Sequence, residues 1–206
     1  MTKWDNHYTQ KELETWLYGR NSLTGATRSW LIRQAKKWTK NSLFLDAGCG
    51  GGVTAFQFGQ EKILDNIQYL GVDFSQCMLD LAHKKVTHRN ACFQKYELDS
   101  LKLNQKFDYI LLRAVLEHNL DPTKILASSL QHLKDDGTFY LIFWNNPVKA
   151  KKVIFLTPGG FYDNSHSEEE LRGVLTSNNC VVHAEHTILE NSFNSNIRII
   201  WEIKHV

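Results

Sequence analysis

The stretch LFLDAGCGGGV, from Leu43 to Val53, decides the fold. An apolar run ends in Asp46, and four of the five residues from Gly48 to Gly52 are glycine. A strand that turns abruptly into a helix needs backbone with positive φ, which glycine adopts at little cost. Bare glycine backbone also lets a ligand approach the N-terminus of the helix that follows. The stretch therefore predicts a ligand at the carboxyl end of the first strand of an α/β sheet.

The spacing of the glycines distinguishes between kinds of nucleotide site. A phosphate-binding P-loop needs Gly-Lys-Ser/Thr, whereas Gly52 is followed by Val-Thr. The dinucleotide pattern Gly-x-Gly-x-x-Gly would need its third glycine where Val53 stands. The observed pattern is Asp-x-Gly-x-Gly-x-Gly, beginning at Asp46. A carboxylate beside the turn repels pyrophosphate and favours an ammonium or sulfonium group, and S-adenosylmethionine carries both cations and no phosphate.

The length, composition and net charge are those of an ordinary globular chain. Its 206 residues are enough for one domain with a sizeable core, and a net charge of +2 argues against a chain dominated by phosphate binding. The polar N-terminus reads as no signal peptide, and no apolar run approaches the ~20 residues of a membrane span. The four cysteines are far apart and form no Cys-x-x-Cys, so we expect a reduced, cytoplasmic protein with free thiols.

Apolar runs alternate with segments of helical length through the middle of the chain. The strand-like runs are SLFLDAG, IQYLGVD, ACFQKYEL, FDYILLRAV and GTFYLIFW. Helices are predicted over 53–64, 75–86 and 122–134, the last starting with Asp121 as N-cap and Pro122 in the first turn. This alternation is typical of a mainly parallel sheet with helices on both faces.

The two ends of the chain break this alternation. Residues 1–40 are predicted to be helical, with a Thr9–Glu12 capping box before one helix and a second helix over Ala26–Trp38. Near the C-terminus, Ser167 and Glu170 cap a helix. The runs CVVHAEHTIL and NIRIIWEIKH then predict an antiparallel pair at the sheet edge.

These elements predict one α/β domain over residues 1–206. Its fold class is Rossmann-like and doubly wound, with about seven strands in a mainly parallel sheet, a C-terminal antiparallel hairpin and an N-terminal helical cap. Residues 1–40 would form the helical cap and residues 41–145 the cofactor-binding core. Residues 146–206 would supply a loop on the substrate side, a helix and the terminal strands.

Several motifs, in order, resemble a known family. LDAGCGGG resembles motif I of the class I S-adenosylmethionine-dependent methyltransferases, and YLGVDFS resembles motif II, which ends in an acid, here Asp73. FDYILLRAVLEHNLDP is similar to the family's fourth strand and following loop, and HLKDDGTFYLIFW to its fifth strand. The resemblance covers roughly residues 40–145. It is nearest in style to the small-molecule group that includes quinone- and biotin-biosynthesis methyltransferases.

The resemblance implies S-adenosylmethionine as the cofactor and assigns residues to it. Asp46 would stabilise the methionine ammonium, Asp73 would accept from both ribose hydroxyls, and Phe74 would pack on the adenine. The other implied positions are Gly48, Cys49 and Gly50 beneath the methionine and ribose, Glu97 or Asp99 at the adenine amino group with Leu98 beside them, and Arg113 and Ala114 at the methionine end.

Methyl transfer from a sulfonium makes few demands on catalytic side chains. Positioning and desolvation supply much of the rate, although an oxygen or nitrogen acceptor can need a base. The candidate bases are His118, His166 and Tyr162. The candidate substrate-binding residues are Tyr8, Arg113, His118, Asn145, Tyr162 and His166. No metal is expected, since His183 and His186 lie three apart on a predicted strand and face opposite ways.

We therefore expect a methyltransferase that acts on an oxygen or nitrogen of a small-molecule metabolite. One alternative is methylation of an RNA, a peptide or a carrier-bound substrate. Another is a protein that binds S-adenosylmethionine without transferring its methyl group. A nucleic-acid partner is not expected, and methylation of amino groups on nucleic-acid bases is not indicated, because no Asn-Pro-Pro-Tyr motif follows the fourth strand. The sequence makes no prediction of the oligomeric state.

Overall fold

The computed structural model describes residues 10–18, 25–145, 153–156, 162–165, 167–189 and 197–206. These residues fall into two compact units, Met1–Glu97 and Leu98–Val206. Each unit is taken by itself below.

Two helices precede the first strand of the first unit, as the sequence predicts. They are α2 (Gln10–Tyr18) and α4 (Ala26–Ala35). The helix expected to continue to Trp38 ends at Ala35, because the amides of Lys37 and Trp38 bond three residues back and tighten the chain into a turn. Thr9 of the expected capping box lies outside the described residues.

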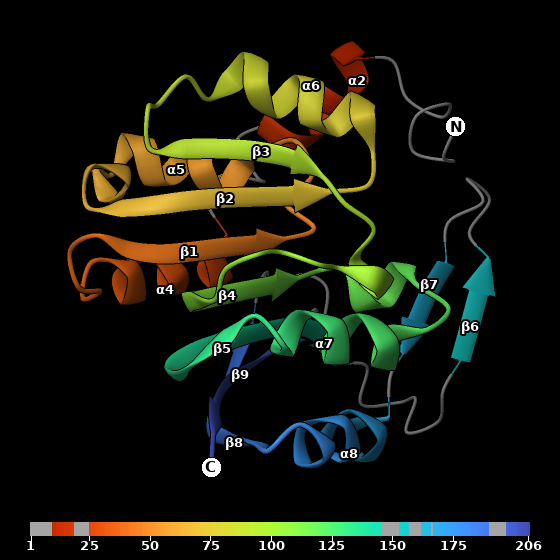
Figure 1. The fold of residues 1–206 in the computed structure, drawn as a ribbon. Coiled ribbons are helices and arrows are strands. Elements are labelled where there is room, and N and C mark those ends of the chain that lie inside the picture. The colour runs from red at the N-terminus through yellow and green to blue at the C-terminus, as the bar shows by residue number, and fades with distance from the viewer. Residues whose placement is uncertain (1–9, 19–24, 146–152, 157–161, 166, 190–196) are drawn as a thin grey trace. The chain divides into compact units, whose positions relative to one another are not determined.

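Three parallel strands form the sheet of the first unit. They are β1 (Ser42–Ala47), β2 (Ile67–Asp73) and β3 (Ala91–Lys95), in the order β3-β2-β1. Their arrowheads lie at the same end in Figure 1. The register places Asp46 opposite Gly71. Both predicted acids, Asp46 and Asp73, therefore lie at or next to the carboxyl ends of neighbouring strands.

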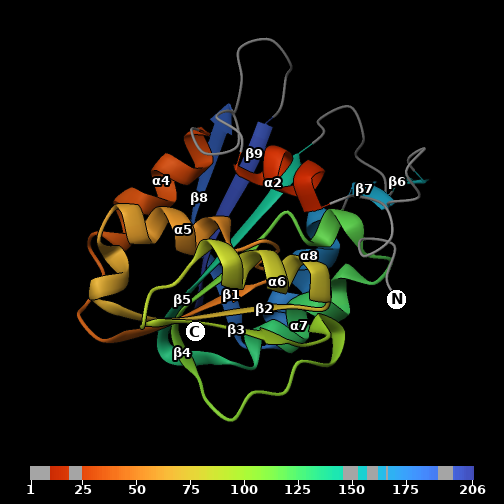
Figure 2. The same cartoon turned by 90° about the horizontal axis from the view of Figure 1, so that it is seen from above.

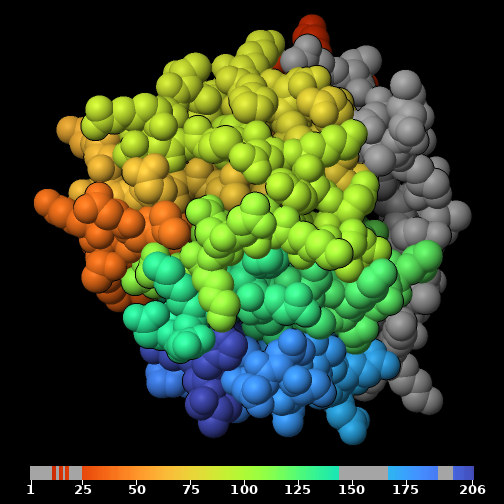
Figure 3. Space-filling view, viewed as in Figure 1, coloured from red at the N-terminus to blue at the C-terminus, as the bar shows by residue number. Residues whose placement is uncertain are grey.

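The helices between these strands lie close to the predicted ranges. The first, α5 (Val53–Gln60), ends earlier than expected, and a short 3-10 helix, η1 (Ile63–Asp65), follows Lys62 with its φ of 59°. The second, α6 (Gln76–Lys85), is capped by Ser75, whose hydroxyl accepts from the Met78 amide at 3.4 Å. In the space-filling view of Figure 3, α6 and the edge strand β3 supply much of the yellow-green surface.

Four strands form the larger sheet of the second unit, in the order β4-β5-β9-β8. The strands β4 and β5 run parallel, whereas β9 is antiparallel to both of its neighbours, β5 and β8. Figure 2 shows β5, β9 and β8 side by side. The bounds of the second unit's elements are η2 (Leu98–Ser100), β4 (Phe107–Arg113), η3 (Leu116–His118), α7 (Pro122–Leu130), β5 (Leu133–Asn145), β6 (Val153–Leu156), β7 (Tyr162–Ser165), α8 (Glu168–Ser177), β8 (Cys180–Leu189) and β9 (Ile197–His205).

The predicted helix starts in this unit are confirmed, but one predicted end is wrong. Asp121 accepts from the Lys124 amide at the start of α7, and Ser167 accepts from the Glu170 amide at the start of α8. The helix expected over 122–134 ends at Leu130 instead. The carbonyl of His132 accepts from the Phe107 amide, and this pairing draws the chain from residue 133 into β5.

The second unit also contains a strand pair that the sequence analysis missed. The strands β6 and β7 form a separate antiparallel sheet of two strands, and β7 contacts η3. The predicted C-terminal hairpin is confirmed, with Leu189 opposite Ile197 and Cys180 opposite His205. None of the helices described is both long enough and apolar enough to cross a bilayer.

Candidate functional site

The glycine turn after β1 has the backbone that its sequence predicts. Gly48, Gly50 and Gly52 have φ values of 78°, 51° and 77°, a region that other residues rarely adopt. The amides of Gly48 and Cys49 both donate to the carbonyl of Val72, at 2.8 and 3.0 Å. Gly52 is the N-cap residue of α5. The turn is therefore fixed to the end of β2 and leads directly into a helix N-terminus.

Asp73 connects this turn to the end of β2. Asp73 is 7% exposed, and its two carboxylate oxygens accept separately from the amides of Gly50 and Ser75, each at 2.9 Å. Its backbone carbonyl accepts from the Tyr96 amide at 3.0 Å, just after β3. A carboxylate oxygen can accept two hydrogen bonds, so each oxygen of Asp73 retains capacity for a ligand hydroxyl beside its amide donor.

Asp46 is held by a residue that the sequence analysis did not single out. The buried Tyr69 hydroxyl donates to Asp46 Oδ2 at 2.5 Å. The two residues meet because the register pairs Asp46 with Gly71, and Tyr69 lies two positions earlier on the same face of β2. The space beside Gly71 is filled by Phe93, whose Cδ1 would lie 2.7 Å from a Cβ at that position. The only signal in the sequence was a tyrosine within a predicted strand.

The electrostatics of the turn are dominated by its two carboxylates. Burial raises the pKa of Asp73 from 3.8 to about 6; the amides of Ser75 and Gly50 lower it, and the charge of Asp46 raises it further. Burial and both acids also raise the pKa of the Cys49 thiol well above its ordinary range, so this thiol is neutral. Two buried carboxylates near one another favour a cationic ligand and oppose a phosphate.

The other expected cofactor residues of the first unit follow the second and third strands. Phe74 follows Asp73 directly and is half-buried, and Glu97 is exposed just beyond β3. The Cys49 side chain packs against the strand, since a Cβ placed on Gly71 would lie 2.9 Å from its Sγ.

The second unit contains the remaining expected residues. Leu98 is buried at the start of η2, and the exposed Asp99 forms an ion pair with Lys124 at 3.3 Å. Arg113 ends β4, and Ala114 follows with φ of 53°, a left-handed conformation that the sequence analysis did not foresee. Such strain in a non-glycine residue is frequent at functional sites.

His118 is the last residue of η3 and has an acidic neighbour that the sequence analysis passed over. Glu117 is 1% exposed, and its Oε1 lies 3.5 Å from an Arg198 guanidinium nitrogen. Tyr8 and His166 lie outside the described residues, and so do the side chains of Asn145 and Tyr162.

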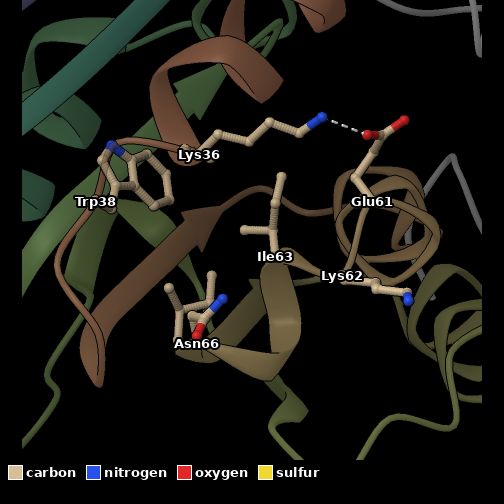
Figure 4. A pocket seen from close by; sticks show the side chains of 8 residues that line it. Lys36, Trp38, Glu61, Lys62, Ile63 and Asn66 are labelled. Carbon is tan, nitrogen blue, oxygen red and sulfur yellow. Dashed lines mark hydrogen bonds and ion pairs between the residues drawn. The ribbon is translucent and has the colours of Figure 1, made fainter.

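One pocket within the first unit is unrelated to the glycine turn. It is lined by residues from the end of α4, from η1 and from the start of β2, among them Lys36, Trp38 and Lys62 (Figure 4). The ion pair between Lys36 and Glu61, 2.7 Å long, crosses its rim. The pocket lies at the amino ends of the strands, whereas ligands of such sheets bind at the carboxyl ends.

Comparison with known proteins matches this site to a family. Residues 45–139, which include the glycine turn and Asp73, match the family model described as a methyltransferase domain. Over these residues the chain is similar to methyltransferase domains. A ubiquinone biosynthesis O-methyltransferase of Glaesserella parasuis is 33% identical over 129 residues, which are 56% of this chain and 52% of that protein. One from Pasteurella multocida is 27% identical over 141 residues, 62% of this chain and 56% of that protein. The chain thus spans about half the length of these relatives.

Solved structures confirm the fold class. The magnesium protoporphyrin IX methyltransferase of Synechocystis PCC 6803, solved with bound SAM, has a TM-score of 0.67 at 17% identity, over 99% of this chain and 90% of that one. The 1,6-didemethyltoxoflavin-N1-methyltransferase of Burkholderia thailandensis has a TM-score of 0.69 at 15% identity, over 92% of this chain and 81% of that one. The chain therefore has the expected Rossmann-like α/β fold.

Proposed function

We propose that this chain is an S-adenosylmethionine-dependent methyltransferase that acts on an oxygen or nitrogen of a small-molecule metabolite. The observation that carries the proposal is the buried carboxylate of Asp73, held by the Gly50 and Ser75 amides beside a left-handed glycine turn. A rigid carboxylate can accept from two adjacent ribose hydroxyls, and the negative charge of the site suits a ligand that carries an ammonium and a sulfonium.

The roles proposed for individual residues follow the resemblance. Asp73 binds the ribose, Phe74 packs on the adenine, and Asp46 stabilises the methionine ammonium. The Tyr69 hydroxyl donates to Asp46 Oδ2 and holds that side chain in one orientation. Glu97 or Asp99 remains proposed for the adenine amino group, with Leu98 beside it, and Arg113 and Ala114 for the methionine end. The bound sulfonium supplies an activated methyl group, so the protein's part is chiefly to orient it and exclude water.

An oxygen acceptor has support from the relatives, two of which are named ubiquinone biosynthesis O-methyltransferase. We propose His118, His166 and Tyr162 as candidate bases for the acceptor hydroxyl, and Tyr8 and Asn145 as candidate substrate contacts. His118 adjoins the buried Glu117–Arg198 pair, which gives η3 a fixed anchor within its unit. Nothing in this assignment requires a metal.

The proposal is tested by calorimetric titration followed by an acceptor screen. S-adenosylmethionine and S-adenosylhomocysteine are titrated into the wild type, and radiolabelled methyl donor is then supplied with a panel of hydroxylated aromatic and amine metabolites. We expect micromolar binding and label in a small-molecule product. Label in RNA or protein from a matched extract would support the macromolecular alternative. Tight binding without any labelled product would support a binding protein that does not transfer methyl groups.

Cofactor affinity is expected to depend on pH through Asp73. The carboxylate accepts both ribose hydroxyls better than the carboxylic acid does, so binding favours the deprotonated form. With a pKa of about 6 in the free protein, affinity for S-adenosylhomocysteine is expected to be level above pH 7. It should then fall towards tenfold per pH unit below 6. Titrations between pH 5 and 8 in buffers of different ionisation enthalpy measure both the affinity and the proton released.

The free energy of unfolding of the ligand-free protein should fall as pH rises, whereas the cofactor affinity should rise. The folded pKa of Asp73 is raised above the unfolded value, so its stabilising contribution is complete below pH 4 and is lost as pH rises through about 6. The size of this loss is about 3 kcal/mol. An affinity for S-adenosylhomocysteine that stays unchanged from pH 7.5 to 5 would contradict the role of Asp73.

A further inference from the structure

The N-terminal helix α2 makes direct contact with the glycine turn. The hydroxyl of Tyr18 donates to the carbonyl oxygen of Gly51. Leu17 approaches the same residue so closely that a Cβ on Gly51 would lie 2.7 Å from Leu17 Cδ1. Gly51 lies between two glycines with positive φ. Thus the last turn of α2 contacts the middle of the segment that we propose as the cofactor site.

Tyr18 is itself held by several neighbours. Its ring lies edge-on to Phe56 of α5, with centroids 5.2 Å apart, and Lys85 Nζ of α6 lies 5.3 Å from its ring centroid. One turn earlier, Glu14 forms ion pairs with Lys84 and Lys85 of α6, at 2.7 and 3.0 Å. Figures 1 and 2 both show α2 next to α6. The hydroxyl therefore reaches Gly51 from a fixed position.

This hydrogen bond completes a set that fixes two peptide groups of the turn, Cys49–Gly50 and Gly51–Gly52. The Gly50 amide donates to Asp73, the Gly51 carbonyl accepts from Tyr18, and the Gly52 amide donates to the Cys49 carbonyl at 3.1 Å. Glycine residues lose the most conformational entropy when they become ordered. A turn without these hydrogen bonds would lose that entropy when a ligand binds, which lowers affinity. Burial raises the pKa of Tyr18, which keeps the phenol protonated as a donor.

We propose that Tyr18 is a cofactor-positioning residue, whose hydroxyl holds the Gly51 peptide in the orientation that binds S-adenosylmethionine. The proposal rests on the proposed function only in taking the glycine turn as the cofactor site. It makes α2 part of the binding apparatus and not merely a cover for the core. Because linkage is reciprocal, bound cofactor should also strengthen the docking of α2.

The test is the Tyr18→Phe variant, which removes the hydroxyl and keeps the ring against Phe56 and Lys85. We expect its affinity for S-adenosylhomocysteine to fall about fivefold to tenfold, the usual effect of one hydrogen bond. The unfolding midpoint of the ligand-free variant should move by no more than about 4 °C. In hydrogen exchange, S-adenosylhomocysteine should protect the amides of residues 10–18 in the wild type and protect them less in the variant.

The matched control is Glu14→Gln, which removes the two ion pairs between α2 and α6 and leaves Tyr18 in place. Such exposed pairs contribute little, so affinity should stay within about twofold of the wild type. A Tyr18→Phe variant that binds S-adenosylhomocysteine like the wild type, or that loses stability without losing affinity, would overturn the inference. A wild type that does not bind S-adenosylhomocysteine would instead overturn the proposed function, and this inference with it.

Discussion

Asp73→Ala is expected to weaken binding of S-adenosylmethionine and S-adenosylhomocysteine at least 100-fold. In the proposed site the carboxylate accepts from two ribose hydroxyls, and a hydrogen bond to a charged group contributes about 1.5–3 kcal/mol. Losing two such bonds corresponds to a loss of 100-fold or more in affinity. The variant also leaves the Gly50 and Ser75 amides without their acceptor, which loosens the turn. Calorimetric titration of both ligands measures the effect.

The control variant for this experiment is Asp80→Ala. Asp80 is an exposed carboxylate on α6 that accepts from Gln76 at 2.9 Å, so its removal changes the net charge equally and leaves the turn intact. We expect its affinity to match the wild type within about twofold.

Binding of a second ligand distinguishes a role of Asp73 at the ribose from a role at the methionine end. Methylthioadenosine has the ribose hydroxyls but no amino-acid group, so Asp73→Ala should weaken its binding by a factor similar to that for S-adenosylhomocysteine. If the variant bound methylthioadenosine as the wild type does, Asp73 would act at the methionine end and the proposed role would be wrong.

The parts of the fold that the sequence predicts correctly are those with local causes. The strand before Asp46, the positive φ of its glycines and the caps at Asp121 and Ser167 all depend on residues within about five positions of one another. Asp73 could be located because it ends an apolar run at the distance that one crossover helix allows. Such features need no knowledge of the tertiary structure.

The features that were missed depend on tertiary pairing. Nothing near Leu133 shows that a helix has ended, because its strand conformation comes from pairing with Phe107, 26 positions away. The contact of Tyr69 with Asp46 follows from the register of β1 and β2, which side-chain periodicity alone does not fix. Tyr18 reaches Gly51 across 33 positions, and its sequence context is that of an ordinary amphipathic helix.

Gly52→Ala is expected to destabilise the ligand-free protein by about 3 kcal/mol. The residue has φ of 77°, where a side chain costs about 1–2 kcal/mol. The new Cβ would also lie 2.9 Å from the Ala82 Cβ and 3.2 Å from the Ala82 Cα, so the backbone of α6 has to move. Overpacking of this kind adds about 1–3 kcal/mol. Urea unfolding gives the free energy, and the thermal midpoint should fall by about 10 °C.

Gly50→Ala provides the matched comparison for this prediction, because it separates strain from overpacking. Its φ of 51° imposes the same left-handed backbone, yet a Cβ there would meet no atom within 4 Å. The loss should therefore be limited to the conformational cost of about 1–2 kcal/mol. Equal losses in the two variants would mean that α6 does not pack closely on the turn. A larger loss at Gly50 would mean that something other than Ala82 constrains the turn, in contradiction to the packing described for α6.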